Sequence, residues 1–159
     1  GLRLACRSVD YIVSGCSSGQ GMMLACNSFP GVLCGYAPSP MDAYLFAQIN
    51  NGNAVSLPLG EDYTWGGYEN FENTIAKLFS EPFGQGYPKD EAARKMKDTR
   101  ILKEIRRNSQ CSAADLLDSL DQSFIEHIMC KQDVVQYILR HGKNSIVQWM
   151  REKATRQYC

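Results

Sequence analysis

Short apolar runs alternate with helix-like segments over the first sixty residues. The runs at 9–13, 32–36 and 54–59 have the length of buried strands, and each is bounded by glycine, proline, asparagine or serine. Helical patterns at 21–28 and from 39 to about 49 separate the three runs. This β-α-β-α-β order with short connections predicts an α/β fold, in which helices cover both faces of a parallel sheet.

The pattern changes after Gly60, where charged helical segments replace the apolar runs. Helices are predicted over 68–80 and 89–108, and a separate group of three or four helices over 109–159. We therefore expect two domains, 1–108 with the sheet and 109–159 as an all-helical C-terminal extension.

Local signals support several of these helices. Ser39-Pro40-Met41-Asp42 offers a serine cap, a proline in the first turn and an early acid. Ser112 begins a similar capping sequence, and Gly142 separates the last two helices, which are predicted at 131–141 and 145–157. The opening residues 1–8 have the pattern of the end of a helix, from which we expect that further residues precede them.

Composition narrows the class of protein. Seventeen basic and seventeen acidic residues give a formal net charge of zero, which argues against a nucleic-acid-binding protein. No apolar run reaches the length of a membrane span, and there is no signal peptide, so we expect a cytoplasmic protein with no membrane association. The seven cysteines are odd in number and lack a C-x-x-C pair, so free thiols are expected. His127 and His141 have no metal-ligating company, so no metal is expected.

The segment from Gly15 to Gly21 carries the clearest chemistry. It reads Gly-Cys-Ser-Ser-Gly-Gln-Gly between a predicted strand and a predicted helix. Such a turn directs backbone N–H groups and a helix N-terminus at an anion, commonly a phosphate. The same dipole favours the thiolate of a cysteine at this point. Cys16 is therefore a candidate base or nucleophile beside an anion-binding loop.

This loop is one of four short motifs that occur in a fixed order. With Asn27, Pro30-Gly31-Val32 and Asn50-Asn51-Gly52-Asn53-Ala54, it resembles the ribose-5-phosphate isomerase B and galactose-6-phosphate isomerase family over about residues 1–100. The resemblance implies a Rossmann-like three-layer α/β/α fold whose N-terminal strands are absent from this chain. It also implies a homodimer or homotetramer that interconverts aldose and ketose sugar phosphates through an enediol, without a metal or a cofactor.

The family's functional positions can be placed on this chain. The resemblance assigns to Cys16 the base that moves a proton between two carbons, and to Ser18 a catalytic role at the sugar oxygens. Asn50 is implied to contact the substrate, and Asn27 to brace the loop. The full set of expected substrate-binding residues is Ser17, Gly19, Gln20, Gly21, Asn27 and Asn50.

Three positions depart from the family pattern, and one of them is Ser17, where the family's loop has a glycine. Ile49 stands where the family has a ring-opening histidine, and Tyr87 where it has a phosphate-binding arginine. An alternative function is therefore a catalytically impaired sugar-phosphate-binding relative with an assembly or regulatory role. A cysteine phosphatase is disfavoured, because its motif requires arginine where this chain has Met22. A dinucleotide-binding oxidoreductase is disfavoured too, because the glycines do not give G-x-G-x-x-G.

Overall fold

The chain forms two compact units in the computed structural model, which describes residues 1–60 and 67–154. The first, the sheet unit, consists of Tyr11–Ser28 and Val32–Ser109. The second, the helical unit, consists of Gly1–Asp10, Phe29–Gly31 and the chain from Gln110 onward. Residues 1–10, which we expected with the sheet domain, thus belong to the helical unit.

The sheet has three parallel strands, β1 (Ile12–Cys16), β2 (Cys34–Tyr36) and β3 (Ala54–Pro58). Their order is β1-β3-β2, so β3 is central and all five of its residues are buried. Both outer strands pair with β3. Their first residues, Ile12 and Cys34, both lie opposite Ala54, the first residue of β3. The α/β fold expected from the pattern is confirmed.

Strand β1 starts later than predicted. The apolar pattern indicated residues 9–13, but the strand runs from Ile12 to Cys16, and Gly15 and Cys16 pair with Leu57 and Pro58. Gly15 lies so close to β3 that an added Cβ would stand 2.5 Å from the Leu57 carbonyl oxygen. The glycine therefore permits close strand contact here, and the loop begins after Cys16 rather than at it.

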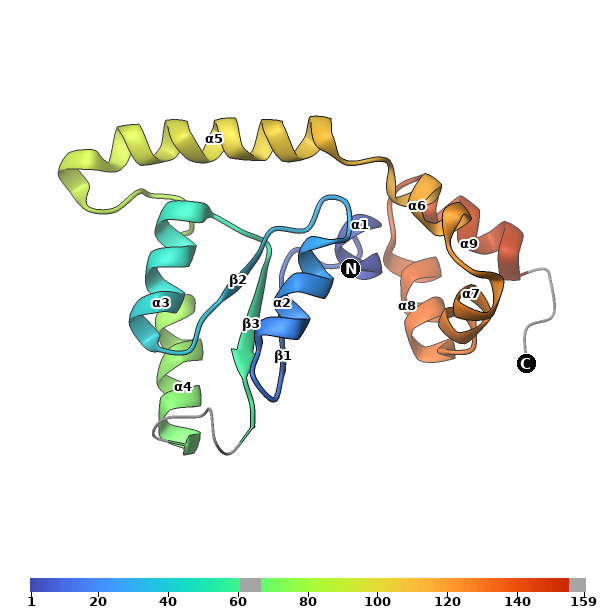
Figure 1. The fold of residues 1–159 in the computed structure, drawn as a ribbon, viewed down its shortest axis with the longest axis horizontal. Helices are drawn as coiled ribbons and strands as arrows, with labels where there is room; N and C mark the ends of the chain where they lie inside the picture. The colour runs from blue at the N-terminus through green and yellow to red at the C-terminus, as the bar shows by residue number, and fades with distance from the viewer. Residues whose placement is uncertain (61–66, 155–159) are drawn as a thin grey trace. The chain divides into compact units, whose positions relative to one another are not determined.

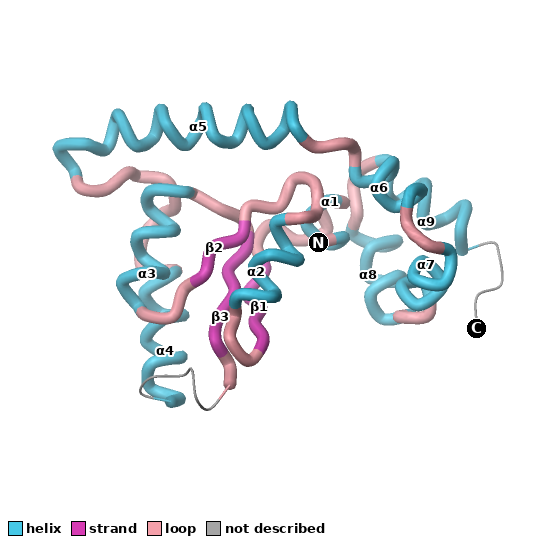
Figure 2. Tube along the Cα trace, in the orientation of Figure 1, coloured by secondary structure: helices cyan, strands magenta, loops and turns pink. Residues whose placement is uncertain are grey.

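Helices cover both faces of the sheet, as Figures 1 and 2 show. Helix α2 (Gln20–Asn27) packs on one face against all three strands. Helices α3 (Pro40–Leu45) and α4 (Gly67–Leu78) pack together on the other face. The core between them and the sheet is formed by Ala37, Ala43, Ala47, Val55, Leu57 and Leu78. The three-layer arrangement is the one that the sequence resemblance implied.

The chain between β2 and β3 holds both a predicted and an unpredicted feature. The Ser39 hydroxyl caps α3 by accepting a hydrogen bond of 3.3 Å from the Asp42 amide, as the sequence indicated. The helix predicted to continue to residue 49 instead becomes a π-helix over Phe46–Asn50. Asn51 then ends it in the left-handed conformation, with φ 47°.

A short 3₁₀ turn, Lys89–Glu91, leads into the long helix α5 (Ala92–Ser109), which lies along the amino edge of the sheet. Three of its side chains bond to backbone carbonyls there. Thr99 Oγ1 donates to Ile49 at 2.6 Å, Lys103 Nζ to Asn51 at 2.5 Å, and Arg106 to Val32 at 2.7 Å. Only Thr99 of this helix is buried, so these polar contacts hold α5 in place.

The helical unit contains α1 (Leu2–Ala5), α6 (Ala113–Ser119), α7 (Gln122–Met129), α8 (Gln132–His141) and α9 (Ser145–Ala154). Residues 155–157, predicted to extend the last helix, lie outside the described residues. The Asn144 side chain donates to the Ala5 carbonyl at 2.5 Å, and the Lys143 amide to the Cys6 carbonyl at 2.8 Å. These bonds attach α1 to a core centred on Cys6, Leu117, Met129, Ile138 and Met150.

The described residues can be searched for membrane-spanning helices, metal-ligand groups and free cysteines. No helix among them is both long enough and apolar enough to cross a bilayer. Nor do they contain a group of three His, Cys, Asp or Glu side chains placed to hold a metal ion. Cys6, Cys16, Cys26, Cys34 and Cys111 are free. Cys130 is disulfide-bonded, so the expectation of a free thiol was wrong at that residue.

Candidate active site

The loop after β1 lies at the carboxyl edge of the sheet, beside the end of β3. The Leu59 amide donates to the Cys16 carbonyl at 2.9 Å, and the Gly60 amide donates to the Ser17 carbonyl at 3.0 Å. These bonds extend the β1–β3 pairing beyond the last strand residues. They fix the backbone at Cys16 against the most buried strand of the sheet, which is a rigid support for a reacting group.

Gly19 shapes the turn from the loop into α2. It is the N-cap of that helix and adopts the left-handed conformation, with φ 75°. An added Cβ would stand 2.7 Å from the Tyr36 ring and 2.9 Å from the Leu57 carbonyl carbon. Only glycine meets both demands, because L-residues disfavour this φ and no side chain fits the space. Gly19 was predicted to bind the substrate through its backbone. The structure adds a separate reason for glycine at this position, because the turn itself can form only with glycine.

Ser56, in the central strand β3, supports the same turn, and no role was predicted for it. Its hydroxyl donates to the Gly19 carbonyl at 2.5 Å, and the residue is fully buried in β3. A polar residue inside the apolar run 54–59 was the signal that could have identified it, since a buried hydroxyl requires a partner. The bond anchors the N-terminus of α2 to the centre of the sheet.

The Cys16 thiol faces the first turn of α2. Its pKa lies below the usual thiol value, chiefly because the Met22 amide donates to it, with further bonds from the Gly19 amide and from Ser18. Desolvation acts in the opposite direction but does not outweigh these donors. Neutral or positive donors near a thiol stabilise the thiolate. The expectation that the helix N-terminus favours a Cys16 thiolate is therefore supported by the structure.

Six of the predicted site residues come together here, in the segment from Cys16 at the end of β1 to Gly21 in the first turn of α2. Ser18 contributes both its side chain and its amide to the Cys16 thiol. Gly21 lies under the sulfur, since an added Cβ there would be 3.9 Å from Sγ. Ser17, Gln20 and Gly21 are exposed, so this segment is open to solvent.

Asn27 lies at the opposite end of α2, away from the loop. Its side-chain amide donates to the Met23 carbonyl at 3.1 Å and to the Cys34 carbonyl at 2.8 Å. Its side-chain oxygen accepts from the Cys34 amide at 3.0 Å. These bonds join the C-terminal end of α2 to the first residue of β2, so within one chain Asn27 braces this junction and not the loop after Cys16.

Asn50 is also separated from Cys16 within one chain. It ends the π-helix just before β3, at the amino edge of the sheet, whereas Cys16 ends β1 at the carboxyl edge. The length of a five-residue strand, about 16 Å, lies between the two edges. Tyr87, at the expected arginine position, packs edge-on against Tyr44 with ring centroids 5.7 Å apart.

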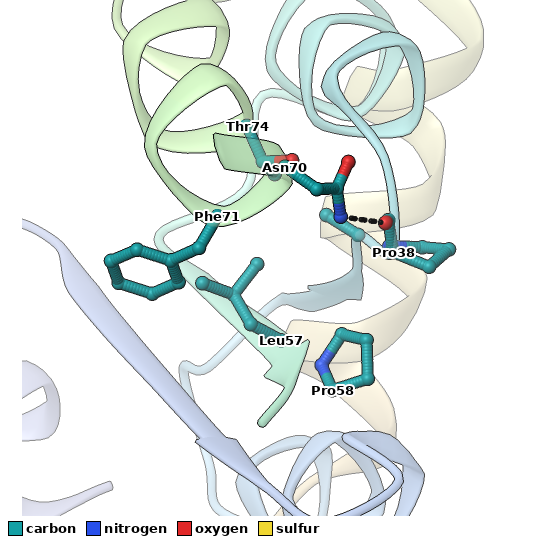
Figure 3. A pocket seen from close by; sticks show the side chains of 7 residues that line it. Pro38, Leu57, Pro58, Asn70, Phe71 and Thr74 are labelled. Carbon is teal, nitrogen blue, oxygen red and sulfur yellow. Dashed lines mark hydrogen bonds between the residues drawn. The ribbon is translucent and has the colours of Figure 1, made fainter. Parts of the chain in front are cut away.

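A small pocket near the loop is shown in Figure 3, on the face of the sheet covered by α3 and α4. It is lined by Ala37, Pro38, Leu57, Pro58, Asn70, Phe71 and Thr74, and the Asn70 amide closes one side by donating to the Pro38 carbonyl at 3.0 Å. Its volume of about 10 Å³ is room for a single water molecule.

A family model and several solved structures match this chain. A family model described as Ribose/Galactose Isomerase matches residues 2–101. The comparison with curated proteins found no match.

Among solved structures, a 4-deoxy-L-threo-5-hexosulose-uronate ketol-isomerase complexed with a tartrate is similar over 98% of this chain and 73% of its own, with 35% identity and a TM-score of 0.89. The ribose-5-phosphate isomerase LacAB_rpiB from Vibrio parahaemolyticus is similar over 97% of this chain and 71% of its own, with 32% identity and a TM-score of 0.85. The type B ribose 5-phosphate isomerase from Trypanosoma cruzi covers 67% of this chain and 65% of its own, with 25% identity and a TM-score of 0.55.

Proposed function

The chain belongs to the ribose/galactose isomerase family, and on that premise we propose that it is an aldose–ketose isomerase in which Cys16 is the catalytic base. The observation that supports this most is the position of the Cys16 thiol, which the Met22 and Gly19 amides and Ser18 surround with donors. A base with a lowered pKa is thiolate at lower pH than an ordinary cysteine. Proton abstraction near neutral pH requires such a group.

The chemistry follows from this arrangement. The Cys16 thiolate removes the proton from the carbon next to the substrate carbonyl, and the electron pair moves to the carbonyl oxygen to give an enediolate. The loop amides and the Ser18 hydroxyl donate to the oxygen on which negative charge develops. The former carbonyl oxygen then takes up a proton, and the hydroxyl on the deprotonated carbon gives one up. As that carbon becomes the new carbonyl carbon, the thiol returns its proton to the former carbonyl carbon, so the carbonyl group has moved by one position and no atom is lost.

The substrate we infer first is a phosphorylated sugar. A glycine-rich turn that leads into a helix N-terminus is suited to an oxyanion, and the neighbour from Vibrio parahaemolyticus is a ribose-5-phosphate isomerase. This assignment does not account for Ile49 and Tyr87, because the Ile49 side chain has no proton to transfer for ring opening, and the Tyr87 side chain cannot clamp a phosphate as arginine does.

A second substrate class, an open-chain uronate, does account for Ile49. The ketol-isomerase neighbour that matches 98% of this chain is named for 4-deoxy-L-threo-5-hexosulose uronate. A sugar ring closes when the hydroxyl at C4 or C5 adds to the carbonyl at C1. That compound has no hydroxyl at C4 and a ketone at C5, so neither position can close the ring. An isomerase for such a substrate needs no ring-opening histidine, and a carboxylate takes the place of the phosphate.

We also propose that the active form is a homodimer. Cys16 and Asn50 lie at opposite edges of the sheet in one chain, so one substrate contacts both only if a second copy brings its amino edge to the first copy's loop. A two-fold arrangement would then form two equivalent sites, each shared between the subunits.

The test is deuterium uptake at the carbon next to the substrate carbonyl, followed by NMR in deuterated water. Ribose 5-phosphate, galactose 6-phosphate and 4-deoxy-L-threo-5-hexosulose uronate form the substrate panel. We expect exchange with one of them, loss of at least about a hundredfold in Cys16→Ala, and no change in the control Cys111→Ala. Substrate binding without exchange would instead favour the catalytically impaired relative, and full activity in Cys16→Ala would overturn the role of Cys16.

A further inference from the structure

The Asn50 side chain differs from those of Asn27 and Asn53 in its hydrogen bonds. Asn27 uses its side-chain amide in three bonds to backbone groups, and the Asn53 side-chain oxygen accepts from the Leu33 amide at 2.8 Å. The half-buried Asn50 side chain forms no hydrogen bond within the part of the chain that the structure describes. Its amide therefore keeps both a donor and an acceptor for a substrate, as the proposed shared site requires.

The carbonyl groups at the end of the π-helix are bonded to groups from outside it. The last carbonyls of a helix have no partner within that helix. Here backbone amides of the 84–86 loop donate to the Ala47 and Gln48 carbonyls at 3.0 and 2.9 Å. The next carbonyl, that of Ile49, accepts from Thr99 Oγ1 of α5 at 2.6 Å. Donors from a loop and from α5 thus fix three consecutive residues just before Asn50.

The peptide planes on either side of Asn50 determine where its side chain points, because each peptide unit is rigid and the two meet at the Asn50 Cα. The plane before Asn50 contains the Ile49 carbonyl, to which Thr99 donates. The plane after it contains the Asn51 amide, which donates to the Phe46 carbonyl at 3.1 Å. One plane is therefore held by the π-helix itself, and the other by a side chain of α5.

Thr99 is well suited to hold a peptide plane. It is 8% exposed, and it is the buried residue of α5. Its β-branched side chain has few accessible rotamers, so the bond through its hydroxyl has a defined direction. The hydroxyl has one proton, and the bond to the Ile49 carbonyl uses it. Any effect of this donor on a reaction therefore passes through the segment that it holds.

We propose that Thr99 is a positioning residue for the isomerisation, which fixes the peptide plane before Asn50 and thereby aims the Asn50 amide at the substrate. This inference rests on the proposed isomerase function, with Asn50 as part of the shared site. It goes beyond that function, because it identifies a residue of α5 that acts through Asn50. An error of about 1 Å in the placement of such a group can cost about a hundredfold in rate.

Three variants test the proposal with the substrate that shows deuterium exchange. Thr99→Val keeps the shape of the side chain and removes the donor, so we expect kcat to fall at least about tenfold, with a smaller change in KM. Thr99→Ser keeps the hydroxyl and should retain most of the activity. Thr74→Val is the matched control and should leave kcat unchanged. Thr74 is a buried threonine of the same unit, and its Oγ1 has no hydrogen-bond partner among the described residues.

The NMR signals of the Asn50 side-chain amide test the geometry without turnover, and their absence in Asn50→Asp identifies them. We expect these signals to shift or broaden in Thr99→Val and to stay in place in Thr99→Ser and Thr74→Val. The Gly84 and Gly86 amides report in the same spectrum whether the end of the π-helix is still formed. Should Thr99→Val fail to fold, Thr99→Ala removes the same bond with a smaller side chain.

Unchanged kcat and unchanged Asn50 signals in Thr99→Val would overturn the proposal. A loss of activity that Thr99→Ser or Thr74→Val shares would overturn it too, because it would show loss of packing rather than of the bond. In an active enzyme, a change in only one of the two measurements has the same meaning.

The proposal and the isomerase function can fail separately. If the wild-type protein exchanges no deuterium with any substrate of the panel, the isomerase function fails. The Asn50 signals then decide by themselves whether Thr99 fixes that side chain.

Discussion

Cys16 is distinguished from the other free cysteines by its surroundings at the level of single atoms. Cys34 shows the contrast, because burial together with the neighbouring Cys26 raises the pKa of its thiol to about 12. The Cys16 thiol accepts hydrogen bonds from backbone amides, whereas the Cys34 thiol is buried beside a second thiol. The pKa of Cys16 is therefore lowered. The same residue type is therefore inert in one place and suited to proton transfer in the other.

The pH dependence of isomerisation follows from this difference. On the proposed mechanism the base is the Cys16 thiolate, so activity should rise with pH through the Cys16 pKa and then level off. The lowered pKa places this rise below that of an ordinary thiol. Ser18→Ala removes one stabilising donor, so the rise should move to higher pH. The pH dependence of Cys16 alkylation, followed by peptide mass spectrometry, gives the same pKa without turnover.

The control for this prediction is Ser28→Ala, which removes a hydroxyl at the other end of α2, where Ser28 bonds to the Leu24 carbonyl. It should leave the alkylation profile in place. An identical profile in Ser18→Ala and wild type would show that the Ser18 hydroxyl does not stabilise the thiolate.

At the scale of elements, the sequence allowed prediction of most helices and strands but not of their ends. The capped helix from Ser39 and the capping residue Ser112 were predicted correctly, because side-chain caps are local. The start of β1 was predicted incorrectly, because its limits depend on pairing with Leu57 and Pro58, some forty residues away in sequence. The π-helix at Phe46–Asn50 and the role of Ser56 likewise depend on contacts that no local pattern reveals.

Helix α5 provides a stability prediction at this scale. Arg106 donates to the Asn27 carbonyl at 3.2 Å and to the Val32 carbonyl at 2.7 Å, and so joins α5 to the C-terminal end of α2 and the start of β2. Since α5 buries little apolar surface, Arg106→Gln should lower the free energy of unfolding by about 1–3 kcal/mol.

Thermal unfolding measures this effect, with Arg107→Gln as the matched control from the exposed side of the same helix. Hydrogen exchange of the α5 amides should also accelerate in Arg106→Gln, because opening of the helix no longer breaks the two bonds. Equal melting temperatures for both variants would show that α5 is held by other contacts.

At the scale of the whole molecule, the predicted site residues divide into two groups. Cys16, Ser17, Ser18, Gly19, Gln20 and Gly21 form one segment, as the sequence spacing suggested, because they are consecutive from the end of β1 through the loop into the first turn of α2. Asn27 and Asn50 were placed with them only by the family resemblance, and a parallel sheet puts both at the opposite edge. Residues that follow a helix and residues that follow a strand lie at opposite ends of a βαβ unit, so one chain cannot unite them.

Subunit complementation tests whether two chains unite them. If each site combines the loop of one subunit with Asn50 of the other, Cys16→Ala and Asn50→Ala should each be inactive alone. Co-refolding equal amounts should restore about one quarter of wild-type activity, because half of the dimers are mixed and each of these has one intact site.

A mixture of Cys16→Ala with Ser18→Ala is the matched control for this experiment, because both changes affect the loop and no mixed dimer then contains an intact site. Its activity should not exceed that of Ser18→Ala alone. Recovery in the first mixture and not in the second would place Asn50 beside Cys16 across a two-fold interface. No recovery in either, with a dimer present by light scattering, would remove Asn50 from the site and leave the loop to act within one chain.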